Sequence, residues 1–356
     1  MEGKNRPVRR EVDVWPRRSP IQISETHAQS MSVKMMSKVL ITGASGFVGQ
    51  ELCTVLEDAG LTIIPVFRSA VPDPGKRIRK ALAGKIIDAA TDWTGDLFDI
   101  DVVVHLAARV HVMGGRKSDD AARFREVNVE GTRNFAEQAA RFGVKRFVYL
   151  SSIKVNGERT ESKPFVADQT PQPEDSYAIS KMEAETVLRD IEKETGMEVV
   201  IIRPPLVYGP GVKGNLAALA RLIKKGIPLP LRSVTNRRDL VSIFNLCDLI
   251  RVCCSHPAAA GDTFLVSDGE TISTADLVLY MSKGLNRKAR LFSVPVWVLH
   301  IAAGLLGKVD KLEKLTGDLQ INMSKTQQVL GWKPPVTVAE SFRRMFAEER
   351  IVDVRP

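Results

Sequence analysis

Short apolar runs rich in β-branched residues alternate with longer segments of helical spacing over the first 205 residues. Short continuous apolar runs predict buried strands, and apolar residues recurring every three or four positions predict amphipathic helices. Strands alternating with helices of this length predict an α/β fold, a doubly wound parallel sheet with helices on both faces. The predicted strands span residues 38–42, 61–67, 101–108, 145–152 and 198–205, and the predicted helices 47–60, 121–143 and 176–196.

Beyond residue 204 the alternation loosens and Pro and Gly become frequent. This change predicts a smaller, mixed region over 204–350, packed intimately against the sheet of residues 37–203 and not a separate domain. The segment "TFLVSDGETISTADLVLYMSKGL" predicts a strand, a loop and a helix with Ser273 or Thr274 as its N-cap. "LGWKPPVTVAESFRRMF" predicts a final capped amphipathic helix.

Two segments stand apart from this pattern. Residues 1–36 mix Pro and Arg without periodicity or a signal-peptide core, which predicts a disordered extension or a start assigned too early. The apolar stretch "VPVWVLHIAAGLLG" at 294–307 is shorter than the ~20 residues that span a bilayer. It predicts a buried or interfacial helix, with peripheral membrane contact as the less favoured alternative.

The net charge and the spacing of the cysteines limit the classes of function that the chain can have. The net charge is +9, but residues 1–38 hold eight Lys/Arg against four Asp/Glu, and the remaining charge is dispersed. Without a basic stripe, an anionic small substrate is expected and a nucleic-acid partner is not. Four cysteines without metal-ligand spacing, and histidines without acidic neighbours at ligand spacing, predict no metal site. This cysteine usage is typical of a reduced, cytoplasmic protein.

A glycine-rich turn follows the first predicted strand. "VLITGASGFVGQEL" sets Gly43, Gly46 and Gly49 between a strand and a helix, the context that gives such a triplet meaning. This arrangement predicts a Rossmann-type dinucleotide site, with the diphosphate at the helix N-terminus. The predicted contacts of this turn are Gly43, Ser45, Gly46, Phe47, Val48 and Gly49.

The end of the second strand bears on the cofactor. An acid about 20 residues past the first glycine favours NAD, but "AGLTIIPVFRSAV" at 59–71 contains none. Arg68 stands where a guanidinium could pair with a 2′-phosphate. NADP(H) is therefore the preferred prediction, with NAD(H) as the alternative.

The strongest chemical signal is "SYAISK", which sets Tyr177 and Lys181 one turn apart on a helix. An adjacent ammonium is expected to lower the pKa of the phenol so that it can act as an acid and a base. Ser152, about 25 residues upstream at a strand end, is expected to orient the reacting oxygen. Ser151 is expected to be structural.

Here the chain resembles the extended short-chain dehydrogenases/reductases of the nucleotide-sugar epimerase/dehydratase family. The resemblance covers about residues 38–345 and rests on "TGASGFVG", "HLAA", "NVEGT", "SSIKVNG", "YAISK", "RPPLVYGPG" and "RRDLVSI" in that order. It implies that Ser152, Tyr177 and Lys181 are catalytic, that Tyr177 and Lys181 also contact the cofactor, and that a homodimer forms. It further implies that Leu106, Ala107, Ala108 and Asn128 contact the cofactor, and that Ser152, Asn215 and Arg238 contact a UDP-sugar.

Family members that eliminate water carry Asp-Glu after this serine, whereas Ile153 and Lys154 stand here, so a dehydratase is not expected. Two hydride-transfer reactions at carbon 4 remain. The first choice is an NAD(P)H-dependent UDP-4-keto-sugar reductase in polysaccharide precursor synthesis, favoured by Arg68. The alternative is a UDP-glucose or UDP-N-acetylglucosamine 4-epimerase with tightly bound NAD. A non-catalytic NAD(P)-binding sensor is the distant third.

Overall fold

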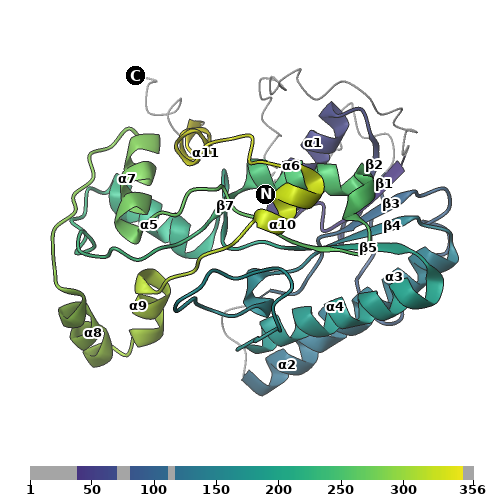
Figure 1. Cartoon of the computed structure of the whole chain (residues 1–356), viewed down its shortest axis with the longest axis horizontal. Coiled ribbons are helices and arrows are strands. Elements are labelled where there is room, and N and C mark those ends of the chain that lie inside the picture. The colour runs from purple at the N-terminus through teal and green to yellow at the C-terminus, as the bar shows by residue number, and fades with distance from the viewer. Residues whose placement is uncertain (1–37, 70–80, 111–116, 348–356) are drawn as a thin grey trace, which may run out of the picture. The chain divides into compact units, whose positions relative to one another are not determined.

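A six-stranded parallel sheet forms the centre of the computed structural model, which describes residues 38–69, 81–110 and 117–347. The order is β2-β1-β3-β4-β5-β8, so the chain runs outward from β1 to β2 and then returns to β3 on the other side (Figure 1). All five pairings are parallel, which confirms the predicted α/β class. The strands are β1 Lys38–Thr42, β2 Thr62–Pro65, β3 Val102–His105, β4 Arg146–Leu150, β5 Glu198–Arg203 and β8 Thr263–Leu265.

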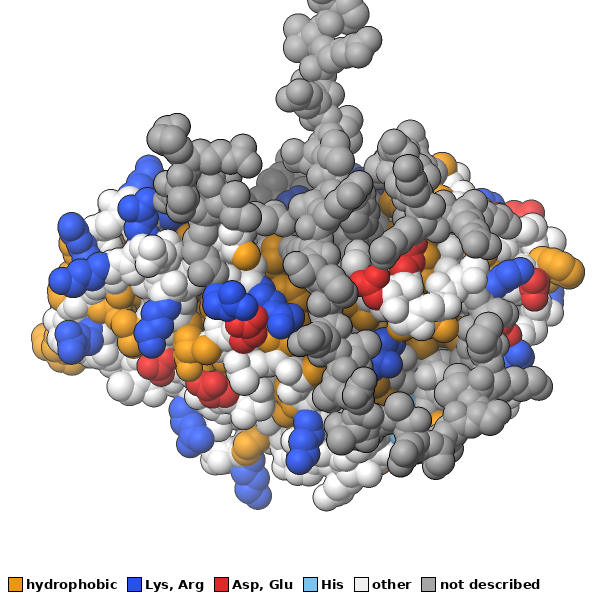
Figure 2. Space-filling model, turned by 90° about the horizontal axis from the view of Figure 1, so that it is seen from above, with side chains coloured by type: hydrophobic (Ala, Val, Ile, Leu, Met, Phe, Trp, Pro, Cys, Tyr) orange, Lys and Arg blue, Asp and Glu red, His pale blue; other side chains and the backbone are white. Residues whose placement is uncertain are grey.

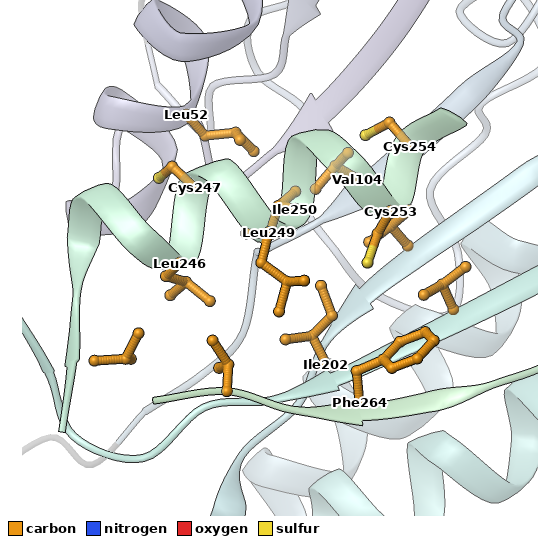
Figure 3. Packing of buried hydrophobic residues seen from close by; sticks show 14 of the residues in the cluster. Leu52, Val104, Ile202, Leu246, Cys247, Leu249, Ile250, Cys253, Cys254 and Phe264 are labelled. Carbon is orange, nitrogen blue, oxygen red and sulfur yellow. The ribbon is translucent and has the colours of Figure 1, made fainter. Parts of the chain in front are cut away.

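Helices cover both faces of the sheet (Figure 1). One face carries α1 (Phe47–Asp58), α6 (Ile243–Ser255) and α10 (Ser324–Leu330), and the other carries α3 (Gly131–Arg141) and α4 (Ser176–Thr195), with α2 (Lys117–Arg125) beside α4. Figure 3 shows α6 with Leu249 and Cys253 directed toward Ile202 of β5 and Phe264 of β8. The four cysteines are free, buried thiols, and burial raises the pKa of Cys53 and of Cys254 to about 12.

The predicted helix over 121–143 is wrong in one respect, because it is three pieces. Residues Glu126–Glu130 form a π-helical turn between α2 and α3. Such turns insert an extra residue and are frequent at functional sites. Gly131 follows the turn, where a Cβ would stand 2.8 Å from Ile87 Cγ2 and 2.9 Å from the Asp88 nitrogen. The loop that contains Ile87 and Asp88 approaches the start of α3 so closely that position 131 requires a glycine.

The chain beyond β5 builds a second cluster of elements. Besides the two apolar cores against the sheet, a third apolar core joins α5, α7 and α11. Ser273 caps α7 in a capping box with Asp276, and Thr337 caps α11, which confirms both predicted helices. The elements are β6 Val207–Tyr208, β7 Val241–Ser242, α5 Gly214–Lys224, α7 Thr274–Gly284, α8 Val296–Leu305, α9 Val309–Thr316 and α11 Val338–Met345, with 3₁₀ turns at Ile153–Val155 and Pro257–Ala259.

Among the residues described, no helix is both long enough and apolar enough to cross a membrane. Residues 1–36, predicted to be an extension, lie outside the described residues. On the face shown in Figure 2, Lys and Arg side chains are interspersed with acidic and apolar ones.

Candidate active site

The glycine turn lies at the carboxyl end of β1, beside the point where the strand order reverses. Parallel α/β sheets bind ligands at this edge and at this reversal. Gly43 has a φ of +71°, and a Cβ there would stand 2.8 Å from the Ala107 nitrogen. A Cβ on Gly49 would stand 2.2 Å from the Gly43 oxygen. The turn between β1 and α1 is therefore sterically closed to any larger residue at both positions.

The N-terminus of α1 fits the diphosphate of a dinucleotide. Its N-cap, Gly46, is exposed and offers no side chain to the first N–H groups of the helix. These groups and the helix dipole favour an anion. Ser45 is exposed next to Gly46, while Phe47 and Val48 are half-buried in the first turn of α1. The predicted contacts thus surround one helix terminus.

A buried hydroxyl and an imidazole support the segment opposite the turn. Thr42 Oγ1 lies 2.8 Å from His105 Nδ1 and accepts a bond from the Ala107 nitrogen at 3.3 Å. His105 Nε2 lies 3.2 Å from Thr132 Oγ1. Burial, with Lys181 nearby, lowers the pKa of His105 to about 3, so the ring is neutral. These contacts fix residues 106–108 beside the glycine turn, where the resemblance implies a cofactor.

Asn128 connects this loop to α4. Its Oδ1 accepts from the Arg109 nitrogen at 2.7 Å, and its Nδ2 donates to the Arg109 carbonyl and to Ser180 Oγ at 3.1 and 3.0 Å. Asn128 lies in the π-helical turn, so that irregularity supplies the clamp. The structure therefore places Asn128 as a support of the loop after β3.

Tyr177 and Lys181 lie in the first turns of α4, whose N-cap is Asp175. Lys181 Nζ donates to the Leu150 carbonyl at 2.7 Å and to the Tyr149 hydroxyl at 3.1 Å. Burial lowers the pKa of Lys181 to about 7, opposed by the Glu185 carboxylate. Lys181 therefore fastens α4 to the end of β4, an arrangement that the i, i+4 spacing did not predict.

The expected lowering of the Tyr177 pKa is wrong for the chain as described. Burial, and secondarily the Asp175 carboxylate, raise the pKa of Tyr177 to about 12. The ring is half-buried and meets Phe124 edge-on at a centroid distance of 6.0 Å. Tyr177 in this setting is a protonated phenol, so it must lose its proton before it can act as a base.

Ser152 and Ser151 take different roles at the end of β4. Ser152 is half-buried, and its Oγ accepts from the Lys154 nitrogen at 3.3 Å as the cap of the 3₁₀ turn. Ser151 is buried, and its hydroxyl donates to Glu185. Glu185 accepts three hydrogen bonds from Arg203, whose Nη1 also donates to Asn156 Oδ1 at 3.0 Å. Ser151 belongs to this buried network, as the structural interpretation of that residue expects.

An ion-pair chain that sequence reasoning missed joins the Ser152 segment to the Tyr177 segment. Lys154 Nζ contacts Asp175 Oδ2 at 2.7 Å and Glu158 Oε1 at 2.5 Å. Glu158 in turn interacts electrostatically with Arg238. A lysine in place of the dehydratase acid pair was a signal, because a half-buried ammonium needs anionic partners.

Three predicted binding residues, Arg238, Asn215 and Arg68, lie outside the group formed by Ser152, Tyr177 and Lys181. Arg238 is half-buried, and its Nη1 donates to the carbonyls of Lys314 and Gly317 at 3.1 and 2.9 Å. Desolvation lowers the pKa of its guanidinium, which stays cationic. Asn215 is exposed at the start of α5, and Arg68 is exposed just after β2. The structure brings Arg238 toward the Lys154 chain, but no described contact links Asn215 or Arg68 to it.

A parallel sheet with a glycine turn, and a Tyr–Lys pair on a helix whose lysine is bound to the end of β4, define a class. The protein is an NAD(P)-dependent enzyme of short-chain dehydrogenase/reductase type. The NAD dependent epimerase/dehydratase family model matches residues 39–267, and the chain belongs to that family.

Known proteins agree with the assignment. The chain is 46% identical over 315 residues to a UDP-glucose 4-epimerase of Vibrio cholerae, covering 87% of this chain and 95% of that protein. It is 28% identical, over 80% of this chain and 82% of the relative, to an N-acetyl-alpha-D-glucosaminyl-diphospho-ditrans,octacis-undecaprenol 4-epimerase of Escherichia coli O157:H7. Its fold matches a UDP-glucose 4-epimerase of Thermotoga maritima solved with UDP-glucose, with a TM-score of 0.70, 20% identity, and coverage of 88% and 99% of the two chains.

Proposed function

We propose that the protein is a 4-epimerase that inverts carbon 4 of a UDP-hexose or UDP-N-acetylhexosamine with NAD. The identity of 46% to the Vibrio cholerae UDP-glucose 4-epimerase, over nearly the whole of both chains, is the observation that supports this most. It favours the epimerase over the 4-ketoreductase that Arg68 had favoured. The buried thiols suit a reducing, cytoplasmic location, and a homodimer stays a prediction from the family resemblance.

NAD, when bound, supplies a hydride acceptor that later returns the hydride. In its phenolate form Tyr177 would take the proton of the sugar 4-hydroxyl as carbon 4 is oxidised to the ketone, and would return that proton to the same oxygen when carbon 4 is reduced from its other face. Ser152 hydrogen-bonds the same oxygen. Lys181, one turn along α4, supplies positive charge beside the phenolate that forms.

Arg238 would bind the diphosphate of the substrate. A guanidinium pairs well with a doubly charged diphosphate, and Arg238 lies within electrostatic reach of the Lys154 chain through Glu158. The Escherichia coli relative is named for a sugar diphosphate on a polyprenol. Because UDP-sugars and polyprenyl-linked sugars share the diphosphate, Arg238 could serve either carrier.

The second candidate is an NADPH-dependent 4-ketoreductase. Arg68 is exposed at the end of β2, and residues 59–69 contain no acid to bind a ribose 2′-hydroxyl. A guanidinium there suits a 2′-phosphate. The triad residues have the same roles in both reactions.

Two incubations of the purified chain separate these candidates. The first supplies UDP-N-acetylglucosamine or UDP-glucose without reductant, and we expect the 4-epimer to accumulate to equilibrium. The second supplies NADPH with a UDP-4-keto-6-deoxy-N-acetylhexosamine, and we expect no stoichiometric loss of NADPH. Stoichiometric NADPH consumption without epimer formation would overturn the epimerase and assign Arg68 to cofactor selection.

A further inference from the structure

Helix α8 is apolar except for His300 and yet lies at the surface. Its ten residues contain no Asp, Glu, Lys or Arg, and only Ala303 is buried. Trp297, Ile301 and Leu305 recur every four residues and are 66%, 56% and 85% exposed. Together with the neighbouring Leu306 they form the α8 face. The one polar side chain of α8, His300, is half-buried, and a helix this apolar is ordinarily buried in a core or in a membrane, so the exposure requires an explanation.

The opposite side of α8 is anchored. Val296 and Leu299 pack against the third apolar core, and α9 lies alongside α8, which is at the edge of the molecule away from the sheet (Figure 1). The orientation of the helix is therefore set by packing. The α8 face is directed outward by the fold itself.

The segments that flank α8 in the sequence are mostly basic. Residues 291–307 contain none of the four charged residue types, and the flanks from 287 to 314 hold six Lys/Arg and two Asp/Glu. Lys288, Arg290, Lys308 and Lys314 are exposed. Apolar and aromatic side chains flanked by cations complement an anionic phospholipid surface, and Trp is favoured at the membrane–water interface. A second copy would bring the same cations together, so the charges disfavour self-association.

We propose that the α8 face docks the protein on an anionic bilayer surface as a peripheral contact. Ten residues of helix extend ~15 Å, about half of the hydrocarbon thickness, so α8 can lie in the interface but not span the bilayer. The flanking cations supply the electrostatic part of the attraction.

Helix α9, which packs against α8, leads to Arg238, the residue proposed to bind the diphosphate. Lys314 and Gly317, at the end of α9, offer the carbonyls to which Arg238 donates, and Asn236 Nδ2 donates to Gly317 at 2.9 Å. A membrane at α8 thus lies next to the elements that hold Arg238. Resting on the proposed function, this placement would bring the bilayer surface to the side of the molecule where Arg238 binds the diphosphate of the substrate.

Vesicle sedimentation tests the docking without any substrate. Purified full chain is spun with vesicles of equal parts phosphatidylglycerol and phosphatidylcholine. We expect the wild type to sediment and the triple variant Trp297→Gln/Ile301→Gln/Leu305→Gln to bind at least about tenfold more weakly. The control Ile86→Gln/Phe98→Gln/Val166→Gln removes exposed apolar residues near the sheet and is expected to bind like the wild type. No wild-type binding, or equal binding by both triple variants, overturns the proposal.

Trp297 reports the contact directly. The other described tryptophans, Trp93 and Trp332, are buried, and the difference between wild type and Trp297→Phe isolates the signal of Trp297. A blue shift of that difference emission with anionic vesicles, weakened by salt, supports the proposal; no shift, or equal binding to pure phosphatidylcholine, contradicts it. If the α8 variant instead dissociates an oligomer in sedimentation velocity while the wild type ignores vesicles, a second copy is the occupant. Because no turnover is measured, these outcomes do not depend on the epimerase assignment.

Discussion

Helices α4 and α8 reverse the usual relation between polarity and burial. Eight of the 20 residues of α4 are charged, yet Lys181 and Glu185 are only 2% and 6% exposed. Helix α8 contains no such residue and is largely exposed. Burying charge and exposing apolar area both cost free energy, so each exception indicates a function. We propose that the function is chemistry in α4 and docking in α8.

The largest expected effect tests the chemistry of α4. Tyr177→Phe removes the acid/base hydroxyl and keeps the ring against Phe124, so turnover should fall by about 10²–10⁴-fold with cofactor binding retained. Epimer formation and NAD binding by calorimetry measure the two parts. Unchanged turnover would show that Tyr177 is not the acid/base, whereas NAD binding without any turnover by the wild type would favour the sensor function.

The next effect tests the buried network of α4. Glu185→Ala leaves the Arg203 guanidinium buried without its carboxylate and should lower the free energy of unfolding by about 3–5 kcal/mol. Denaturant titration measures the loss. The double variant Glu185→Met/Arg203→Met removes both charges and should be markedly less destabilised. Equal losses of unfolding free energy in the two variants would show that lost packing, and not the unpaired charge, causes the destabilisation.

The third effect is a shift in pH dependence. The Asp175 carboxylate helps to raise the pKa of Tyr177, so Asp175→Asn should lower that pKa. The phenolate then forms at lower pH, and the acid limb of kcat/KM for epimerisation should move to lower pH by up to about one unit. Asparagine is also a good N-cap, so α4 should persist. The control Glu174→Gln removes an exposed charge one residue away, and an equal shift in that variant would contradict the assignment.

The smallest expected effect belongs to α8. Trp297→Gln and Leu305→Gln alter exposed side chains, so each should change the free energy of unfolding by no more than about 0.5 kcal/mol. Ala303→Gln, at the buried position of the same helix, should cost more than either because of overpacking. Thermal unfolding ranks the three variants. A large loss from Trp297→Gln would mean that the face is structural.

The sequence predicted the parallel sheet and the glycine turn well because both depend on local patterns. β-Branched runs mark buried strands wherever they occur, and no side chain fits at Gly43 or Gly49. The π-helical turn was missed because an inserted residue leaves the apolar spacing of 121–143 nearly unchanged. The clamp formed by Asn128 depends on that turn.

Residue types and spacing by themselves predicted the fold class, the glycine turn and the Tyr177–Lys181 pair, and the resemblance of the motifs to a known family implied the family and the candidate triad with Ser152. Only the tertiary structure decided which partners these side chains meet. Lys181 reaches Tyr149 and Leu150, and Lys154 joins Asp175 and Glu158. The pKa of a group and the exposure of a helix depend on neighbours from distant parts of the chain. For that reason only the tertiary structure shows the raised pKa of Tyr177 and the outward face of α8.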